Sequence, residues 1–214
     1  MQAGMEPDWT KQAVRAVMLD RRRAQSRLAR AWRSRAIARR VRDLSAWRAA
    51  RVVFLYAPIR GEVDPASLAR DAWARGLTVA YPRVAGPGWL AFHRVGVPAA
   101  LAPGVMGIPE PRADEATLIP VAAADVILVP GVAFSLSGDR LGWGGGYYDA
   151  LLAARPGAAI AVGLAYAFQI VSGLPREAHD RRVDALVTER GLALPGAGPD
   201  HSRRSSTRVP PIKN

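Results

Sequence analysis

Short apolar runs alternate along the chain with segments whose apolar positions recur at helical spacing. Each run is five or six residues long, which suits a buried strand. A helical segment separates the first two runs, and a strand, a crossover helix and a second strand form one unit of a parallel sheet. The pattern therefore predicts an α/β fold: a largely parallel sheet flanked by helices, in a three-layer sandwich. The runs lie at 51–56, 77–81, 125–129, 158–163 and 185–189, and the last of them is expected to be the final strand.

Residues that start and stop elements support this division. Asp64 is suited to cap the first crossover helix, Pro65 fits its first position, and Gly76 is expected to end it. The pair at 82–83, Pro-Arg, is expected to stop the second strand. Residues 95–120 are rich in Pro, Gly and Ala and predict a long loop, a kind of segment that often binds ligands.

Two arginine-rich amphipathic helices are predicted ahead of the first strand. The first begins near Thr10 and the second after Ser26, and both residues are favourable helix caps. Arginines dominate the polar faces of both helices. The apolar stripe of the second helix is predicted to consist of Leu28, Trp32, Ile37, Val41 and Leu44.

Length and composition fit one folded domain with unstructured ends. Half of the 214 residues are apolar, which is enough to build a large core. We predict a single α/β domain over residues 10–194. Residues 1–9 are predicted to be a disordered N-terminus, and residues 195–214, rich in Pro, Gly, Ser and Arg, a disordered tail.

Several classes of function are excluded by what the sequence lacks. With no cysteine, it can form no disulfide, thiolate metal site or cysteine nucleophile, and its three histidines are too scattered to indicate zinc. No apolar run approaches the roughly 20 residues of a membrane span, and the N-terminal segment lacks the apolar core of a signal peptide. We expect a cytoplasmic monomer that does not associate with membranes.

The positive charge is concentrated in one N-terminal segment. Residues 11–51 hold 14 of the 30 basic residues and two of the 18 acidic ones, so the rest of the chain is balanced. This pattern favours a solvated basic face, with salt-dependent nucleic-acid binding as the alternative. Trp32 and Trp47 fit a core stripe better than a stacking platform, so nucleic acid is an unlikely partner. Lys11 is one of only two lysines, which favours a specific need for an ammonium group that reaches a phosphate.

The stretch at 130–149, PGVAFSLSGDRLGWGGGYYD, is the strongest candidate for a functional site. Five glycines lie between Gly138 and Gly146, after a predicted strand and before a helix that begins near Tyr147. Uncovered backbone N–H groups next to a helix N-terminus form a favourable cradle for phosphate. A flexible surface loop is the alternative, but flexible linkers lack the Trp, Tyr and Leu found here.

Two common nucleotide motifs can be excluded for this loop. It contains no lysine, as a Walker A motif requires, and its glycines do not fit the spacing Gly-x-Gly-x-x-Gly of dinucleotide-binding folds. What remains is an anion cradle with Arg140 as a fixed cation. Asp149 close to it indicates magnesium, which combines carboxylate with phosphate oxygens, although an acid in the first turn of a helix is also favoured by the helix dipole.

The same stretch resembles the signature of the 5-formyltetrahydrofolate cyclo-ligase (5,10-methenyltetrahydrofolate synthetase) family. Further similarities follow in order along about residues 11–191, which makes the resemblance far more specific than any single motif. They are Lys11 with Arg15, 61–64 (GEVD), 82–83 (PR), 107–111 (GIPEP), Gln169, 179–184 (HDRRVD) and 187–189 (VTE).

The resemblance implies an ATP- and Mg²⁺-dependent ligase that converts 5-formyltetrahydrofolate into 5,10-methenyltetrahydrofolate. It implies that Arg140, Lys11 and Tyr147 act in catalysis and that Asp149 and Asp180 serve the metal. The implied folate-binding residues are Ala57, Glu62, Trp143, Gly144, Gly145, Gly146 and Tyr147. The implied ATP-binding residues are Lys11, Arg15, Arg140, Leu141, Gly142, Trp143, Gly144, Gly145, Gly146, Tyr147 and Tyr148.

This sequence departs from the family pattern in two places. Some relatives carry a basic residue where this chain has Trp143 or Gly145, so Lys11 and Arg15 are expected to supply that charge. Arg60 precedes the implied folate residue Glu62 and is expected to contact the glutamate tail of the substrate. An ATP-dependent relative that acts on another folate-like substrate is a further alternative.

Overall fold

The computed structural model describes residues 10–97 and 101–195. Within them, an eight-stranded sheet has the strand order β13-β12-β10-β7-β1-β2-β3-β6. Its five central strands, β12 to β2 in that order, are parallel, and β13, β3 and β6 are antiparallel to their neighbours. The strands are β1 (Val52–Phe54), β2 (Thr78–Gly86), β3 (Trp89–Arg94), β6 (Leu118–Ile119), β7 (Val126–Val129), β10 (Ile160–Leu164), β12 (Ala185–Val187) and β13 (Leu192–Ala193).

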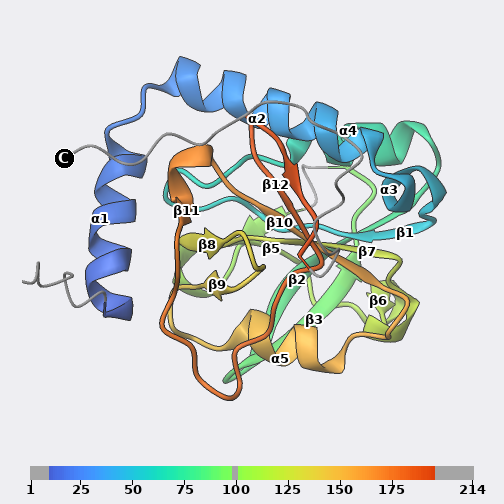
Figure 1. The fold of residues 1–214 in the computed structure, drawn as a ribbon. Helices are drawn as coiled ribbons and strands as arrows, with labels where there is room; N and C mark the ends of the chain where they lie inside the picture. Colours follow the sequence, from blue (N-terminus) through green and yellow to red (C-terminus); the bar gives the residue numbers. More distant parts are fainter. Residues whose placement is uncertain (1–9, 98–100, 196–214) are drawn as a thin grey trace, which may run out of the picture.

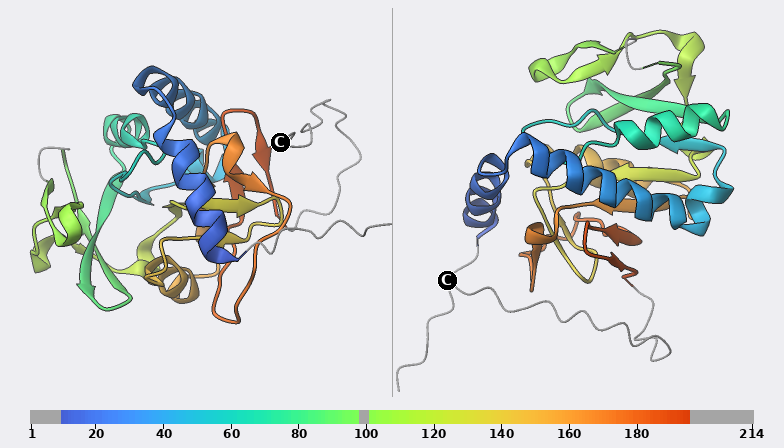
Figure 2. Two further views of the ribbon diagram at one scale, coloured as in Figure 1. Left: turned by 90° about the vertical axis from the view of Figure 1, so that its left-hand side faces the viewer. Right: turned by 90° about the horizontal axis from the view of Figure 1, so that it is seen from above.

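Helices cover both faces of this sheet, as Figures 1 and 2 show. On one face lie α2 (Arg27–Asp43), α3 (Ser45–Ala49) and α4 (Ala66–Ala74), and on the other lies α5 (Tyr147–Ala154). Successive strand residues point to opposite faces. Val53 accordingly packs in the core beneath α2 and α4, whereas Phe54 packs with α5. The predicted three-layer α/β fold is confirmed.

The first helix, α1 (Lys11–Arg23), packs away from the main sheet. It covers a small three-stranded sheet of order β11-β8-β9, formed by Ile170–Val171, Ala133–Ser135 and Arg140–Leu141. Val14 and Met18 on α1 bury against Val132, Ala133 and Leu141. The glycine-rich stretch is therefore partly a β8–β9 hairpin, which the sequence analysis did not predict, and it lies beside α1 in Figure 1.

Several predicted boundaries agree with the structure. Thr10 and Ser26 cap α1 and α2 by accepting backbone hydrogen bonds from Ala13 and Ala29. At α4 the boundary is shifted by one residue, because Pro65 is the N-cap and Ala66 the first helical residue, although the side chain of Asp64 accepts a hydrogen bond from the backbone N–H of Ala66. These caps work because the first N–H groups of a helix lack partners within the helix.

The predicted apolar stripe of α2 is wrong at its N-terminal half. Ile37 and Val41 are buried, but Leu28 and Trp32 are 85% and 61% exposed. Leu28 and Trp32 lie nine and five residues before Ile37, which turns them roughly 180° and 140° away from it around the helix axis, so they face solvent. Trp47 is buried and cannot stack on nucleic-acid bases, so the argument against nucleic-acid binding holds for Trp47 but not for Trp32.

Three other expectations require correction. β2 does not stop at residues 82–83 but continues to Gly86, because Pro82 and Arg83 pair with the antiparallel strand β3. The segment 185–189 is not the last strand, since β13 follows it. The predicted loop 95–120 contains β4 (Leu101–Pro103), β5 (Pro109–Pro111) and β6, with 3-10 turns at Val105–Gly107 and Glu115–Thr117.

The predictions of a disordered N-terminus at 1–9 and a disordered tail from 195 concern residues that lie outside the described part of the chain, Pro195 excepted. The other short elements are 3-10 turns at Val121–Ala123 and Ala167–Gln169. In the part of the chain that the structure describes, no helix is both long and apolar enough to cross a membrane.

Candidate active site

The candidate site lies at the carboxyl end of the parallel strands. β10, β7 and β1 are neighbours in the sheet, so the segments that follow them start from the same edge. These segments carry Tyr166 and Gln169 after β10, the glycine-rich loop after β7 and Glu62 after β1. Ligands of parallel α/β sheets bind at this edge.

The glycine loop has a backbone that other residues would disturb. Gly144 has a φ of 105°, in the region that residues with a side chain rarely adopt. A Cβ atom added to Gly142 would lie 2.5 Å from Nη1 of Arg140. The loop leads directly into α5, whose first residue, Tyr147, is half-buried. The predicted join between the glycine loop and a helix N-terminus is therefore present, and Gly144 to Gly146 are exposed.

Arg140 is buried and paired, not a free cation. Its side chain is 4% exposed, and its Nη2 donates to Oδ2 of Asp149 at 2.8 Å. Oδ1 of Asp149 accepts a hydrogen bond from the backbone N–H of Arg181 at 3.1 Å. The Tyr148 ring lies 5.8 Å from the guanidinium, and burial raises the pKa of its hydroxyl. Arg140 thus connects the β8–β9 hairpin to the first turn of α5.

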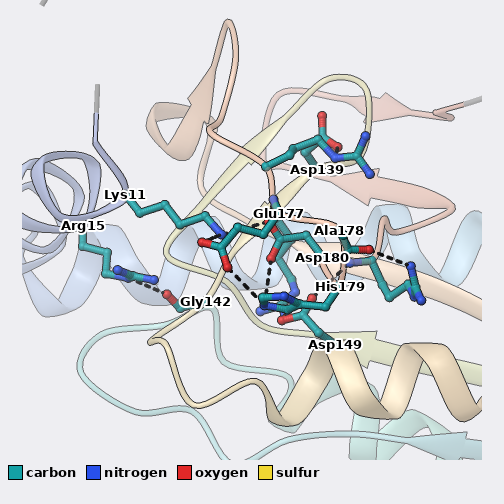
Figure 3. Close-up of polar contacts among 12 residues, drawn as sticks. Lys11, Arg15, Asp139, Gly142, Asp149, Glu177, Ala178, His179 and Asp180 are labelled. Carbon is teal, nitrogen blue, oxygen red and sulfur yellow. Dashed lines mark hydrogen bonds and ion pairs between the residues drawn. The ribbon is translucent and has the colours of Figure 1, made fainter. Parts of the chain in front are cut away.

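The N-terminal end of α1 contacts the glycine loop, as the resemblance implies (Figure 3). Nε of Arg15 donates to the carbonyl oxygen of Gly142 at 2.9 Å. Nζ of Lys11 lies 2.8 Å from Oε1 of Glu177 and 2.9 Å from Oδ2 of Asp180. Burial acts to lower the pKa of Lys11, but the hydrogen bonds to the two carboxylates outweigh it and raise the pKa.

The two aspartates implied as metal ligands come together in the fold. The backbone N–H of Arg181, the residue after Asp180, donates to Asp149, and Figure 3 shows the two carboxylates in the same cluster. Both carboxylates are engaged, Asp149 by Arg140 and Asp180 by Lys11. Residues 10–97 and 101–195 contain no cluster of three or more His, Cys, Asp or Glu that could hold a metal alone.

Glu62 is a buried carboxylate that faces the glycine loop. Its side chain is 4% exposed. Nε1 of Trp143 donates to its Oε1 at 3.1 Å, and the backbone N–H of Ile59 donates to its Oε2 at 3.1 Å. The guanidinium of Arg60 lies 4.6 Å from the centre of the Trp143 ring. Ala57, which precedes this turn, is buried. The loop thus contacts both α1, through Gly142, and Glu62, through Trp143.

A pocket of about 450 Å³ opens beside Glu62 and is strongly basic. A second pocket of about 360 Å³, which Glu62 lines, shares Arg30 and Gly61 with it. Arginines of α1, α2 and the turn after β1 contribute most of the charge. The first pocket is lined by Leu19, Arg22, Arg23, Arg30, Arg60, Gly61 and Trp143.

Sequence reasoning missed Arg22, which is fully buried next to Glu62. The signal was present, because Arg22 continues the spacing of Val14 and Met18, four residues apart on the buried face of α1. A charged residue in an apolar stripe indicates a buried partner. The run of arginines at 21–23 concealed this signal.

Asp139 holds the turn of the β8–β9 hairpin. Its Oδ2 accepts hydrogen bonds from the hydroxyls of Ser135 and Ser137, at 3.0 and 2.7 Å. Its Oδ1 lies 2.7 Å from Nε of Arg182 and 3.0 Å from Nε of Arg176. Burial acts to raise the pKa of Asp139, but these hydrogen bonds and charges outweigh it and lower the pKa.

The lowered pKa of Asp139 predicts an acid-dependent contribution to stability. The folded protein holds the ionised form more tightly than the unfolded chain does, so the contribution is present above the ordinary pKa of 3.8 and is lost as pH falls below it. We expect Asp139→Asn to destabilise the protein at pH 7 by on the order of 1 kcal/mol, or roughly 2–4 °C in Tm. Thermal unfolding of both proteins as a function of pH should show the difference shrinking towards pH 3. A constant difference would contradict this account.

Comparisons with known proteins agree with the fold. The chain matches the 5-formyltetrahydrofolate cyclo-ligase family over residues 8–189. It is 32% identical to the 5-formyltetrahydrofolate cyclo-ligase of Escherichia coli strain K12 over 149 residues, 65% of this chain and 78% of the relative. It is 31% identical to that of Haemophilus influenzae, over 62% of this chain and 73% of the relative.

A solved structure is also similar. The NMR structure of Aquifex aeolicus 5,10-methenyltetrahydrofolate synthetase superposes with a TM-score of 0.76 and 35% sequence identity, covering 92% of this chain and 99% of that one. Fold, site and relatives together define the protein as a ligase. It belongs to the 5-formyltetrahydrofolate cyclo-ligase family. The resemblance noted in the sequence is confirmed.

Proposed function

We propose that this protein uses ATP and Mg²⁺ to convert 5-formyltetrahydrofolate into 5,10-methenyltetrahydrofolate, releasing ADP and phosphate. The observation that carries the proposal is the position of the glycine loop. Gly142 contacts Arg15 of α1, and the next residue, Trp143, contacts the buried carboxylate of Glu62. A phosphate held on one side of this loop would lie close to a heterocycle held on the other.

Phosphoryl transfer depends mainly on positioning and charge neutralisation. In the proposed reaction the formyl oxygen attacks the γ-phosphorus of ATP and ADP leaves. N10 then attacks the activated formyl carbon and loses its proton, and the ring closes as the C–O bond breaks and phosphate departs with that oxygen. A formamide oxygen is a weak nucleophile, so holding it in line contributes much of the rate.

The nucleotide side of the site consists of α1 and the glycine loop. The exposed backbone of Gly144 to Gly146 is suited to bind phosphate oxygens through N–H groups. Lys11 and Arg15 add positive charge from α1, and Arg140 keeps the loop in place. A phosphate group would compete with Glu177 and Asp180 for the ammonium of Lys11, which is half-buried and within reach of both.

The two carboxylates are suited to hold Mg²⁺ together with the nucleotide, and not to hold it without the nucleotide. Mg²⁺ in phosphoryl-transfer sites takes one or two carboxylates, phosphate oxygens and water. Asp149 and Asp180 offer two carboxylates in one cluster, and the nucleotide would supply the remaining charge. The bound ion would neutralise charge on the phosphoryl oxygens.

The folate side consists of Glu62, Ala57, Trp143 and Tyr147. A carboxylate accepts two parallel hydrogen bonds from an amino group and an adjacent ring N–H, a pairing that suits the pterin edge. The aromatic rings of Trp143 and Tyr147 offer surfaces for the heterocycle. Arg60, next to the pocket, is suited to the anionic glutamate tail.

The direct test is an absorbance assay of the purified protein. With ATP, Mg²⁺ and 5-formyltetrahydrofolate, we expect 5,10-methenyltetrahydrofolate to accumulate, and we expect none when ATP is omitted. Product formation at the rate of the ATP-free control would refute the proposal. Release of ADP with another folate, but not with 5-formyltetrahydrofolate, would identify a relative with a different substrate.

A further inference from the structure

Arg22 is a buried arginine without enough partners. It lies in the last turn of α1, and 1% of the residue is exposed. Its Nη2 donates to the carbonyl oxygen of Gly131, and its Nη1 lies 3.7 Å from Oε1 of Glu62. Within residues 10–97 and 101–195, its Nε and Nη1 have no hydrogen-bond partner. An arginine carries five donors, so most of its capacity is unused here.

The hydrogen bond to Gly131 does not explain why this position is an arginine. The Gly131 carbonyl also accepts a hydrogen bond from Nε2 of Gln169 at 3.1 Å, so it keeps a partner without Arg22. The buried stripe of Val14 and Met18 would accept an apolar residue at position 22. Burying a guanidinium is costly unless an opposite charge compensates it. The buried opposite charge beside Arg22 is Glu62.

We propose that Arg22 is a positioning residue that keeps Glu62 ionised and oriented towards the ligand pocket. Both residues line the basic pockets, Arg22 the larger one and Glu62 the adjoining one. The identity of the ligand as a folate rests on the proposed function. The electrostatic coupling of Arg22 to Glu62 does not.

The groups that face Glu62 come from every element around it. The hydroxyls of Tyr56 and Tyr166 donate to the backbone oxygens of Val63 and Glu62, and the hydroxyl of Tyr148 lies nearby on α5. None of these groups carries positive charge. Arg30 of α2 lines both pockets, but the charges that act most strongly on the pKa of Glu62 are those of Arg22 and Arg60. Arg60 is exposed and stacks on Trp143, so solvent screens its charge.

Burial raises the pKa of Glu62, and the charge of Arg22 is the largest effect that opposes this rise. Arg22 is therefore the main group that opposes protonation of this buried carboxylate. A charged carboxylate accepts two hydrogen bonds from a ligand edge, whereas a protonated carboxyl carries a donor that would face the N–H groups of that edge.

The test without ligand uses Trp143, whose indole N–H is bonded to Glu62. The protein has six tryptophans, so the same titration of a Trp143→Phe variant is subtracted to isolate this one. Removing the charge with Arg22→Met should move the midpoint of the Trp143 fluorescence transition upwards by at least about one pH unit. Arg22→Lys, which keeps the charge, should restore most of the difference.

Arg21→Gln is the matched control, because Arg21 is the preceding residue of α1 and lies outside both pockets. It should leave the midpoint unchanged. If Arg22→Met does not fold, Arg22→Gln also removes the charge and can still donate towards Gly131. A midpoint equal to that of the wild type in the folded neutral variant, or no Trp143-dependent transition between about pH 4 and 9, overturns the proposal.

Kinetics provide a second test that a merely structural role would not satisfy. In Arg22→Met, KM for the folate should rise about tenfold for each unit by which the pKa of Glu62 exceeds the assay pH, with kcat changed much less. The KM should fall again as pH increases and Glu62 ionises. A pH-independent KM increase overturns the proposal. If the protein binds no folate, the proposed function fails while the fluorescence titration still decides the role of Arg22.

Discussion

Arg140→Ala is expected to lower kcat/KM for ATP by roughly a thousandfold, or about 4 kcal/mol of transition-state stabilisation. The guanidinium is the buried partner of Asp149, at 2.8 Å. Removing it leaves that carboxylate uncompensated next to the proposed phosphate site, where it would repel the nucleotide. It also removes the side chain that fixes the start of the glycine loop to α5. Both effects act on the nucleotide, so KM for the folate should change far less.

Steady-state kinetics with each substrate varied in turn measure this effect. Arg155→Ala is a suitable control, because Arg155 forms a similar ion pair with Asp184, whose carboxylate accepts a hydrogen bond from the backbone N–H of Ala161 in β10. It should reduce the stability and leave kcat/KM for ATP nearly unchanged. Asp149→Asn should also reduce turnover severely, and combining it with Arg140→Ala should cost less than the sum of the two effects. Wild-type kinetics in both single variants would remove this pair from the mechanism.

The sequence predicts the central sheet well because its strands are buried on both faces. Continuous apolar runs such as 125–129 have no competing interpretation once helical spacing is absent. The edges of the fold are less predictable. Pro82 is expected to end a strand, yet β2 continues through it because it pairs there with β3 in a hairpin. Trp32 is apolar, but it lies five residues before the buried Ile37, which turns it roughly 140° away around the helix, so it faces solvent.

The candidate site, like the sheet, has parts that the sequence predicts from neighbouring residues and parts that depend on residues far apart in the chain. The glycine loop and its helix follow from residues adjacent in the chain. The pairing of Lys11 with Asp180 joins residues 169 positions apart, and only the resemblance to a known family connected them beforehand. Charge pairing was the least predictable property. The sequence marks Arg140 and Asp149 as charged, but not that they neutralise each other.

Glu62→Gln is expected to raise KM for 5-formyltetrahydrofolate by roughly a hundredfold, or about 2.7 kcal/mol, with KM for ATP changed by less than about threefold. An amide can accept a hydrogen bond through its oxygen, but its NH₂ group would face the donors of the pterin edge. The substitution therefore replaces an attraction by a repulsion at a buried side chain. Unlike the loss of Arg22, this loss should not be reversed at high pH, because the amide does not titrate.

The substitution also leaves Arg22 without its buried counter-charge, so some loss of stability will accompany it. Glu110→Gln separates the two effects. Glu110 is an equally buried carboxylate, 3.7 Å from Arg83, and lies on β5 outside both pockets. Thermal unfolding should show both variants destabilised, whereas kinetics should show a higher folate KM for Glu62→Gln alone. An equal KM for both variants would mean that the carboxylate of Glu62 serves the fold and not the ligand, and Arg22 would then be its structural partner only.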